Sequence, residues 1–145
     1  MTSDRIVAVA RRWIGTPFHH QAALRKVGCD CLGLVRGVWL ELGGTAPHEN
    51  MDYDRYWCHR SGPNLLIQGL SAYLRPVPID DIEHGDVIAC AMRFGAAAQH
   101  VGFLTQDQSR RGFVHSHSEH GVQETAFDPI WSRLAVAAFR FPNKG

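Results

Sequence analysis

The segment GCDC at residues 28–31 combines residue types that nucleophilic catalysis or zinc binding would need. Cys31 falls in the first turn of an expected helix, where unpaired backbone N–H groups and the helix dipole favour negative charge. That position, or a neighbouring histidine, can lower a cysteine pKa from about 8.5 to between roughly 3.5 and 7.5. We therefore expect a reactive thiolate at Cys31, with core packing as the alternative. Cys29 precedes the helix and is interpreted as packing, and Asp30 as the helix N-cap.

A thiolate nucleophile needs a base, and the base needs a residue that orients it. Among nine histidines, His100 opens the strand-like segment QHVGFLT and His115 lies in GFVHS. A hairpin with a four-residue loop at 106–109 would pair Thr105 with Arg110 and set His100 directly opposite His115. Facing residues have Cβ atoms about 4.5 to 5.5 Å apart, so the two imidazoles could hydrogen-bond.

A register shifted by two residues would instead set His117 opposite His100. It requires a two-residue turn at Gln108 and Ser109, which lacks the glycine or asparagine that such turns favour. We therefore prefer His115. For each histidine, a solvent-facing strand position is the alternative.

The elements that would carry these residues are helical first and extended later. A helix capped by Thr2 or Ser3 should end at 15–17, and apolar spacing predicts further helices at 30–42 and 64–74. Strands are expected at 86–90, 99–105, 112–116, 122–125 and 135–141, with a short helical turn at 128–129. Helices followed by an antiparallel sheet give an α+β fold.

Composition favours a single globular domain over residues 1–145. Hydrophobic residues make up 45% and the net charge is +1, with basic residues scattered, so nucleic-acid binding is not expected. The segment MTSDRIVAVARRW has charges without an apolar region between them, so neither a signal peptide nor a membrane span is expected. The chain should be made in the cytoplasm, with its four cysteines as free thiols.

A zinc site is the main alternative chemistry. Cys29 and Cys31 could bind zinc together with histidines from the 115–120 cluster. Cys-x-Cys is not the usual spacing of structural zinc pairs, and the chain has no second Cys-x-x-Cys. We therefore expect no metal and no other cofactor.

Several motifs in order resemble the NlpC family of cysteine peptidases, which have a papain-like core. They are GTPF at 15–18, GCDCLGL at 28–34, GDV at 85–87, QHVGFL at 99–104 and FVHS at 113–116. The resemblance covers roughly residues 6–141 and implies N-terminal helices packed on a C-terminal antiparallel sheet. It further implies a Cys31 nucleophile, a His100 base and a His115 orienting residue. Family members cleave peptide-stem bonds of bacterial peptidoglycan, commonly next to D-glutamate and diaminopimelate.

Two positions depart from the family pattern. A tyrosine whose hydroxyl lies near the nucleophile is common where this chain has Phe18, and serine is common where it has Leu32. His19 or His20 are the candidate polar groups in place of that hydroxyl, beside Asp30. The Cys31 N–H is the natural first oxyanion donor.

The compact form, GCDC and the ending FRFP look like cell-wall peptidases of tailed phages and gene transfer agents. The resemblance implies that the enzyme travels on a virion-like particle, docks to tail-tip or baseplate proteins and acts in the periplasm or cell wall of the target cell. Tyr53, Tyr56 and Trp57 in the 45–62 segment are a candidate contact, or a loop packed on its own domain. The alternatives in function are a catalytically silent tail module with the same fold, or amide hydrolysis or acyl transfer on another substrate.

Overall fold

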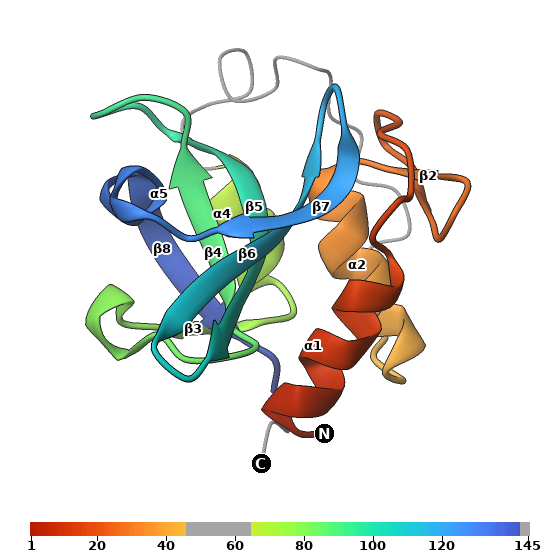
Figure 1. Cartoon of the computed structure of the whole chain (residues 1–145), viewed down its shortest axis with the longest axis horizontal. Helices are drawn as coiled ribbons and strands as arrows, with labels where there is room; N and C mark the ends of the chain where they lie inside the picture. Colours follow the sequence, from red (N-terminus) through yellow and green to blue (C-terminus); the bar gives the residue numbers. More distant parts are fainter. Residues whose placement is uncertain (46–64, 143–145) are drawn as a thin grey trace.

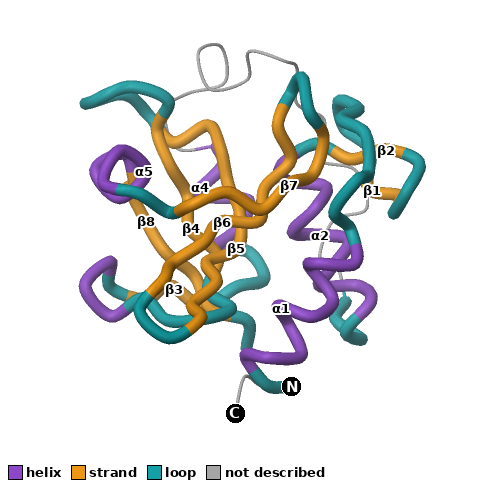
Figure 2. Tube along the Cα trace, viewed as in Figure 1, coloured by secondary structure: helices purple, strands orange, loops and turns teal. Residues whose placement is uncertain are grey.

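The structure, a computed structural model, describes residues 1–45 and 65–142. Helices α1 and α2 lie beside one another along one side of a sheet, and α5 lies at the other side (Figure 1). Figure 2 shows the same arrangement, with β1 and β2 lying apart from the main sheet. The elements are α1 (Ser3–Arg12), β1 (Ala23–Leu24), β2 (Gly28–Cys29), α2 (Cys31–Glu41), α4 (Leu65–Ser71), β3 (Arg75–Val77), the 3-10 helix η1 (Ile79–Asp81), β4 (Val87–Ala91), β5 (Ala98–Asp107), β6 (Arg110–His117), β7 (Gly121–Ala126), α5 (Pro129–Leu134) and β8 (Ala135–Arg140).

The first helix begins where its sequence predicts and ends at Arg12, before the predicted stop at 15–17. The Thr2 hydroxyl accepts a hydrogen bond from the Arg5 N–H at 3.1 Å and caps α1. Its apolar face is buried, and Trp13, which follows the helix, is only 2% exposed. The chain turns away at Gly15, whose φ of 93° suits a residue without a Cβ.

Helix α2 packs tightly against the end of α1. A Cβ on Gly37 would lie 2.1 Å from Cη2 of Trp13, so the tryptophan ring occupies the space that a side chain would fill. The helix is largely buried, because it lies between α1 and strand β5. The N-terminus of α2, where Cys31 lies, is thereby held against the sheet.

The main sheet has six strands in the order β3-β8-β4-β5-β6-β7, each antiparallel to its neighbours. The predicted α+β fold, with N-terminal helices on a C-terminal antiparallel sheet, is confirmed. Two parts of the sheet structure were not expected: β3, which pairs with β8, and the two-stranded β1-β2 sheet before α2. Both consist of too few residues to show a period.

Apolar side chains fill both faces of the sheet. The larger cluster lies between the sheet and helices α1, α2 and α4, and includes Val101, Phe103 and Val114. The smaller cluster lies on the opposite face and includes Leu104, Phe113 and Phe127, with Trp131 of α5 packed against it. The alternation along β5 and β6 follows the period of two that a strand imposes.

The predicted register of the β5-β6 hairpin is wrong. Thr105 pairs with Gly112 and Asp107 with Arg110, so the turn holds only Gln108 and Ser109. His115 consequently lies opposite Gly102 and not opposite His100. Gln108 adopts a φ of 58°, so the chain makes this two-residue turn without a glycine. The absence of glycine is the reason for preferring the four-residue loop from the sequence.

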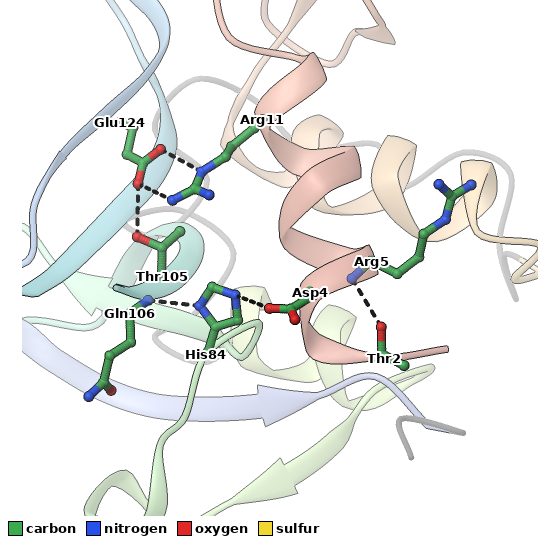
Figure 3. Close-up of polar contacts among 8 residues, drawn as sticks. All are labelled: Thr2, Asp4, Arg5, Arg11, His84, Thr105, Gln106 and Glu124. Atoms are coloured by element: carbon green, nitrogen blue, oxygen red, sulfur yellow. Dashed lines mark hydrogen bonds and ion pairs between the residues drawn. The ribbon is translucent and has the colours of Figure 1, made fainter. Parts of the chain in front are cut away.

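A polar network joins α1 to the sheet (Figure 3). Arg11 donates two hydrogen bonds to the Glu124 carboxylate of β7, at 2.9 and 3.0 Å. The Thr105 hydroxyl donates to the same carboxylate at 2.9 Å. His84 accepts from the Gln106 N–H through Nδ1 and lies 3.2 Å from the Asp4 carboxylate through Nε2. The network ties the N-terminal helix to strands β5 and β7.

Some sequence predictions fall on residues outside the described ranges. The proposed contact segment 45–62, with Tyr53, Tyr56 and Trp57, lies outside them except for its first residue, as does Cys58. The third predicted helix, 64–74, is seen as α4 over Leu65–Ser71. The single domain over residues 1–145 stays a prediction. No helix within 1–45 or 65–142 has both the length and the apolar character to cross a bilayer.

Candidate active site

Cys31 opens α2 at the edge of a pocket of about 350 Å³. The pocket brings together residues from the loop before α2, from α2 itself, from strands β5 and β6, and from α5. It is lined by Phe18, His20, Asp30, Cys31, Leu32, Met92, Gln99, His100, Ser116, His117, Ser118 and Trp131. The predicted nucleophile and the predicted base therefore face one cavity, although 69 positions separate them in the printed sequence.

Cys31 is partly buried at the N-terminus of α2. Burial, and secondly the negative charge of Asp30, raise the pKa of the thiol to about 12. Hydrogen bonds with the backbone of Val101, Leu32 and Cys31 itself act in the opposite direction. The expectation of a lowered pKa is thus wrong, because desolvation of the thiolate exceeds the stabilisation at the helix end. Cys31 rests as a neutral thiol at neutral pH.

His100 lies next to the backbone that contacts this sulfur. Its neighbour Val101 makes one of the hydrogen bonds to the thiol. Cys90 pairs with His100 and Ala91 with Ala98, so the β4-β5 ladder bulges at Gln99. A bulge bends a strand and redirects its side chains. Here it occurs beside the predicted base, with Gln99 and His100 both in the pocket lining.

The two predicted catalytic histidines are in contact. Nε2 of His100 lies 2.8 Å from Nδ1 of His115, a hydrogen-bonding distance. Because the register sets His115 opposite Gly102, this contact runs diagonally between the strands. His117, the alternative third residue, lines the pocket and stacks on His120 with ring centroids 4.8 Å apart. Its ring centroid is 6.5 Å from that of His115.

Aromatic packing fixes the ring of His115. Its side chain is buried at 2% exposure and stacks on Phe113 with centroids 4.9 Å apart. A Cβ on Gly102 would lie 2.8 Å from the Phe113 ring, so the absence of a side chain there leaves room for that ring. The remaining nitrogen, Nε2, lies 3.1 Å from the Thr125 hydroxyl of β7.

Both histidines are neutral at neutral pH. Burial, and then repulsion from His115 and His117 in their protonated forms, lower the pKa of His100 to about 3. Burial and then His117 lower the pKa of His115 to about 4. The resting site is therefore a neutral thiol beside two neutral imidazoles, one of which can accept a proton.

The predicted supporting residues separate in space. Asp30 is 3% exposed and caps α2, with Oδ1 accepting from the Gly33 N–H at 2.7 Å and Oδ2 from the Gln21 N–H at 2.8 Å. The predicted N-cap is thus confirmed. His20 lines the pocket, with Nδ1 4.0 Å from Oδ2 of Asp30.

His19 and Phe18 take different places. The His19 ring lies over Gly28, where a Cβ would be 2.3 Å from Cδ2 of that ring, and His19 does not line the described pocket. Phe18 lines the pocket and pairs with Cys29 in an isolated β-bridge. Of the two candidate polar groups, only His20 therefore faces the cavity within the described part of the chain.

The arrangement required for the zinc alternative does not form. Cys29 is fully buried, its sulfur 3.9 Å from the Ser116 hydroxyl. Within residues 1–45 and 65–142, no group of three or more histidine, cysteine or acidic side chains is placed to hold a metal ion. Cys29 instead packs in the core, as the sequence predicted.

Three residues of the site were missed by sequence reasoning. Trp131 of α5 stacks on His100 with centroids 5.5 Å apart, Gln99 occupies the bulge, and Thr125 contacts His115. The helical turn predicted at 128–129 indicates α5. It does not indicate that Trp131 of this helix lines the pocket. Nothing in the local sequence distinguishes Thr125 from any other strand threonine.

Comparison with known proteins places this geometry in a family. The sequence profile of the NlpC/P60 family matches residues 15–140, most of the chain and all of the candidate residues. The chain belongs to the NlpC/P60 family. No curated protein matches the sequence.

Solved NlpC/P60 structures share the fold. A family protein from Bacillus cereus ATCC 10987 superposes with a TM-score of 0.70 at 19% identity, covering 97% of this chain and 40% of that one. The NlpC/p60 domain of the peptidoglycan hydrolase SagA gives a TM-score of 0.60 at 18% identity, covering 97% and 100%. NlpC1 from Trichomonas vaginalis gives 0.57 at 16% identity, covering 96% and 43%. The chain thus spans about two fifths of the Bacillus cereus protein.

Proposed function

We propose that this NlpC/P60 chain is a cysteine peptidase that hydrolyses amide bonds in the peptide stems of bacterial peptidoglycan. The observation that carries the proposal is the shared pocket of Cys31 and His100, with His100 hydrogen-bonded to His115 at 2.8 Å. A nucleophile, a base and an orienting residue in this order are the parts that acyl transfer requires. The peptidoglycan hydrolase SagA has the same fold, which supports the choice of substrate.

The resting protonation states define the first step. Because the thiol and the imidazole are both neutral, the proton must leave Cys31 as the nucleophile attacks. His100 takes this proton, the sulfur attacks the amide carbonyl carbon, and the oxyanion that forms faces the N–H groups at the start of α2. His20 is the candidate side-chain donor to that oxyanion, since it faces the pocket where Phe18 cannot donate.

The remaining steps return the protein to its starting state. His100 donates the proton to the leaving amine, the carbon–nitrogen bond breaks, and a thioester to Cys31 remains. Water then enters, gives a proton to His100 and attacks the thioester carbonyl. Cys31 leaves as a thiolate, recovers the proton from His100, and the carboxylic acid product is released.

Muropeptide mass spectrometry tests the activity. Purified peptidoglycan incubated with the wild-type chain should release shortened stem peptides, and Cys31→Ala should reduce their rate of release at least about a thousandfold. Cys29→Ala is the matched control two positions away and should retain hydrolysis. A wild-type chain that folds but releases no peptides would instead support the catalytically silent module. A chain that hydrolyses other amides but not peptidoglycan would show that the proposed substrate is wrong.

We further propose that the chain is carried on a phage-like tail or gene transfer agent particle, docked to tail-tip or baseplate proteins, and acts in the periplasm or cell wall of the target cell. This part is supported by the sequence resemblance of GCDC and FRFP. Mass spectrometry of particles purified from producing cells should detect the chain together with tail proteins. Its absence from intact particles would contradict this mode of delivery.

A further inference from the structure

Three side chains on successive strands form a hydrogen-bonded row. His100 of β5 contacts His115 of β6 through Nε2 and Nδ1 at 2.8 Å. His115 in turn contacts the Thr125 hydroxyl of β7 through Nε2 at 3.1 Å. Both nitrogens of His115 are therefore engaged. The ring nitrogen of His100 that this row leaves available for Cys31 is Nδ1.

The direction of the bonds in this row depends on one proton. A neutral imidazole has a single N–H, so His115 donates at one nitrogen and accepts at the other. His115 is neutral at neutral pH because burial lowers its pKa to about 4. A threonine hydroxyl can either donate or accept. Two arrangements of the row are therefore possible.

Only one of these arrangements leaves His100 able to act as a base. If Thr125 accepts, His115 carries its proton on Nε2, its Nδ1 accepts from the Nε2–H of His100, and Nδ1 of His100 has a lone pair. If Thr125 donates, every bond reverses, and His100 carries its proton on Nδ1. The S–H bond of Cys31 can break with formation of a new Nδ1–H bond only in the first arrangement. The electron pair then stays on sulfur.

The first arrangement also fits the product of that proton transfer. Protonated His100 has an N–H on both nitrogens, so Nδ1 of His115 must accept from it. His115 must then hold its own proton on Nε2, directed at Thr125. The Thr125 oxygen thus serves as the acceptor both before and after Cys31 gives up its proton.

We propose that Thr125 is a positioning residue that selects the Nε2–H tautomer of His115 and thereby keeps the Nδ1 lone pair of His100 available to Cys31. This role rests on the proposed function. The strand that carries Thr125 is itself fixed at the adjacent residue, because Glu124 binds Arg11 and Thr105. Stacking on Phe113 holds the His115 ring in the orientation that reaches Thr125.

Imidazole NMR of the full chain labelled with ¹⁵N-histidine tests the tautomer. Wild-type His115 should be protonated at Nε2 and unprotonated at Nδ1 at about pH 7. Thr125→Val has nearly the same shape but no acceptor, and should lose this single tautomer. Thr125→Ser keeps the hydroxyl and should retain it. Wild-type His115 protonated at Nδ1, or Thr125→Val with the wild-type tautomer, would overturn the proposal.

Alkylation of Cys31 by iodoacetamide at about pH 8, followed by peptide mass spectrometry, tests the consequence. Thr125→Val should slow the reaction about tenfold, the effect of losing one partly buried hydrogen bond, and Thr125→Ser should stay within about twofold of wild type. Thr45→Val makes the same change at an exposed position outside the pocket lining and is the matched control, expected to react like wild type. Equal slowing in both valine variants would reduce Thr125 to a structural role and refute the inference.

The two readouts separate this inference from the proposed function. A wild-type chain with the expected tautomer that does not cleave peptidoglycan would contradict the function and leave the tautomer assignment standing. A chain that cleaves peptidoglycan with His115 protonated at Nδ1 would contradict the role of Thr125 alone.

Discussion

Asp30 has two opposite effects on the residue that follows it. Its carboxylate caps α2 and binds the Gln21 N–H, which fixes the loop that leads into the helix. The same negative charge raises the pKa of the Cys31 thiol, after burial the second cause of that shift. The cap therefore positions the nucleophile and at the same time disfavours its ionised form.

We expect Asp30→Asn to lower the pKa of Cys31 below its wild-type value of about 12. Asparagine caps helices about as well as aspartate, so α2 should remain while the negative charge is removed. Alkylation of Cys31 followed across pH would show the titration moving to lower pH. Asp80→Asn, which removes an exposed charge from η1, should leave it unchanged. A Cys31 titration that stays in place or moves upward in Asp30→Asn would contradict the electrostatic account.

Sequence motifs located the candidate residues better than they described their environment. Cys31, His100 and His115 could be chosen from residue type and spacing, and the structure brings them together. The sign of the Cys31 pKa shift could not be predicted, because desolvation depends on how β5 and α5 enclose the helix end. Thr125 could not be predicted either, since its contact with His115 depends on the strand register.

At the level of elements, the β5-β6 hairpin sets the geometry of the site through its turn. Gln108 has a φ of 58°, a conformation that favours glycine over residues with a Cβ. The lack of glycine at 108–109 favours a four-residue loop, and the observed register differs from that loop's register by two residues. Twelve pairing strand residues and their packing outweigh the strain at one turn residue. Local turn preference was the weaker signal.

Gln108→Gly should therefore stabilise the protein. Removing the Cβ relieves strain at a positive φ, although glycine also gains freedom in the unfolded chain, so the net gain should be about 0.5 to 1 kcal/mol. Thermal unfolding should show a higher Tm than wild type. Ser109→Gly is the matched change at the other turn position, where φ is not positive, and it should not raise the Tm. A lower Tm for Gln108→Gly would argue against strain at this turn.

At the level of the whole molecule, folding buries two imidazoles in neutral form. The ordinary pKa of 6.5 falls to about 3 for His100 and to about 4 for His115. The unfolded chain therefore binds protons that the folded chain does not bind over this range. Stability from these groups is fully present above about pH 6.5 and is lost as the pH falls toward 4.

Urea unfolding at about pH 7, 6 and 5 should show the free energy of unfolding decreasing with acidification. Each of the two histidines contributes on the order of 1 kcal/mol per pH unit in this window. His115→Gln should reduce the slope, because glutamine does not titrate. A stability that stays constant or rises between pH 7 and 5, or an unchanged slope in His115→Gln, would contradict neutral burial of this pair.

The overall architecture could be predicted from the sequence because helical and extended periods occupy separate parts of the chain. The α+β class and most strands follow from that separation. The position of β8 between β3 and β4 could not be predicted, because apolar alternation in 135–140 identifies a strand without naming its partners. The pairing of β3 with β8 depends on this same long-range choice.

The central place of β8 has a consequence for synthesis. Strand β4, the partner of the strand that carries His100, has β8 as its other neighbour, and β8 comes last in the sequence among the described strands. A nascent chain that has not yet emerged past Arg140 leaves one side of β4 without its hydrogen-bonding partner. The producing cell would thus meet an assembled cysteine–histidine pocket only after residues 135–140 have been made. Fragments that stop before these residues would carry the nucleophile without the enclosure that directs it.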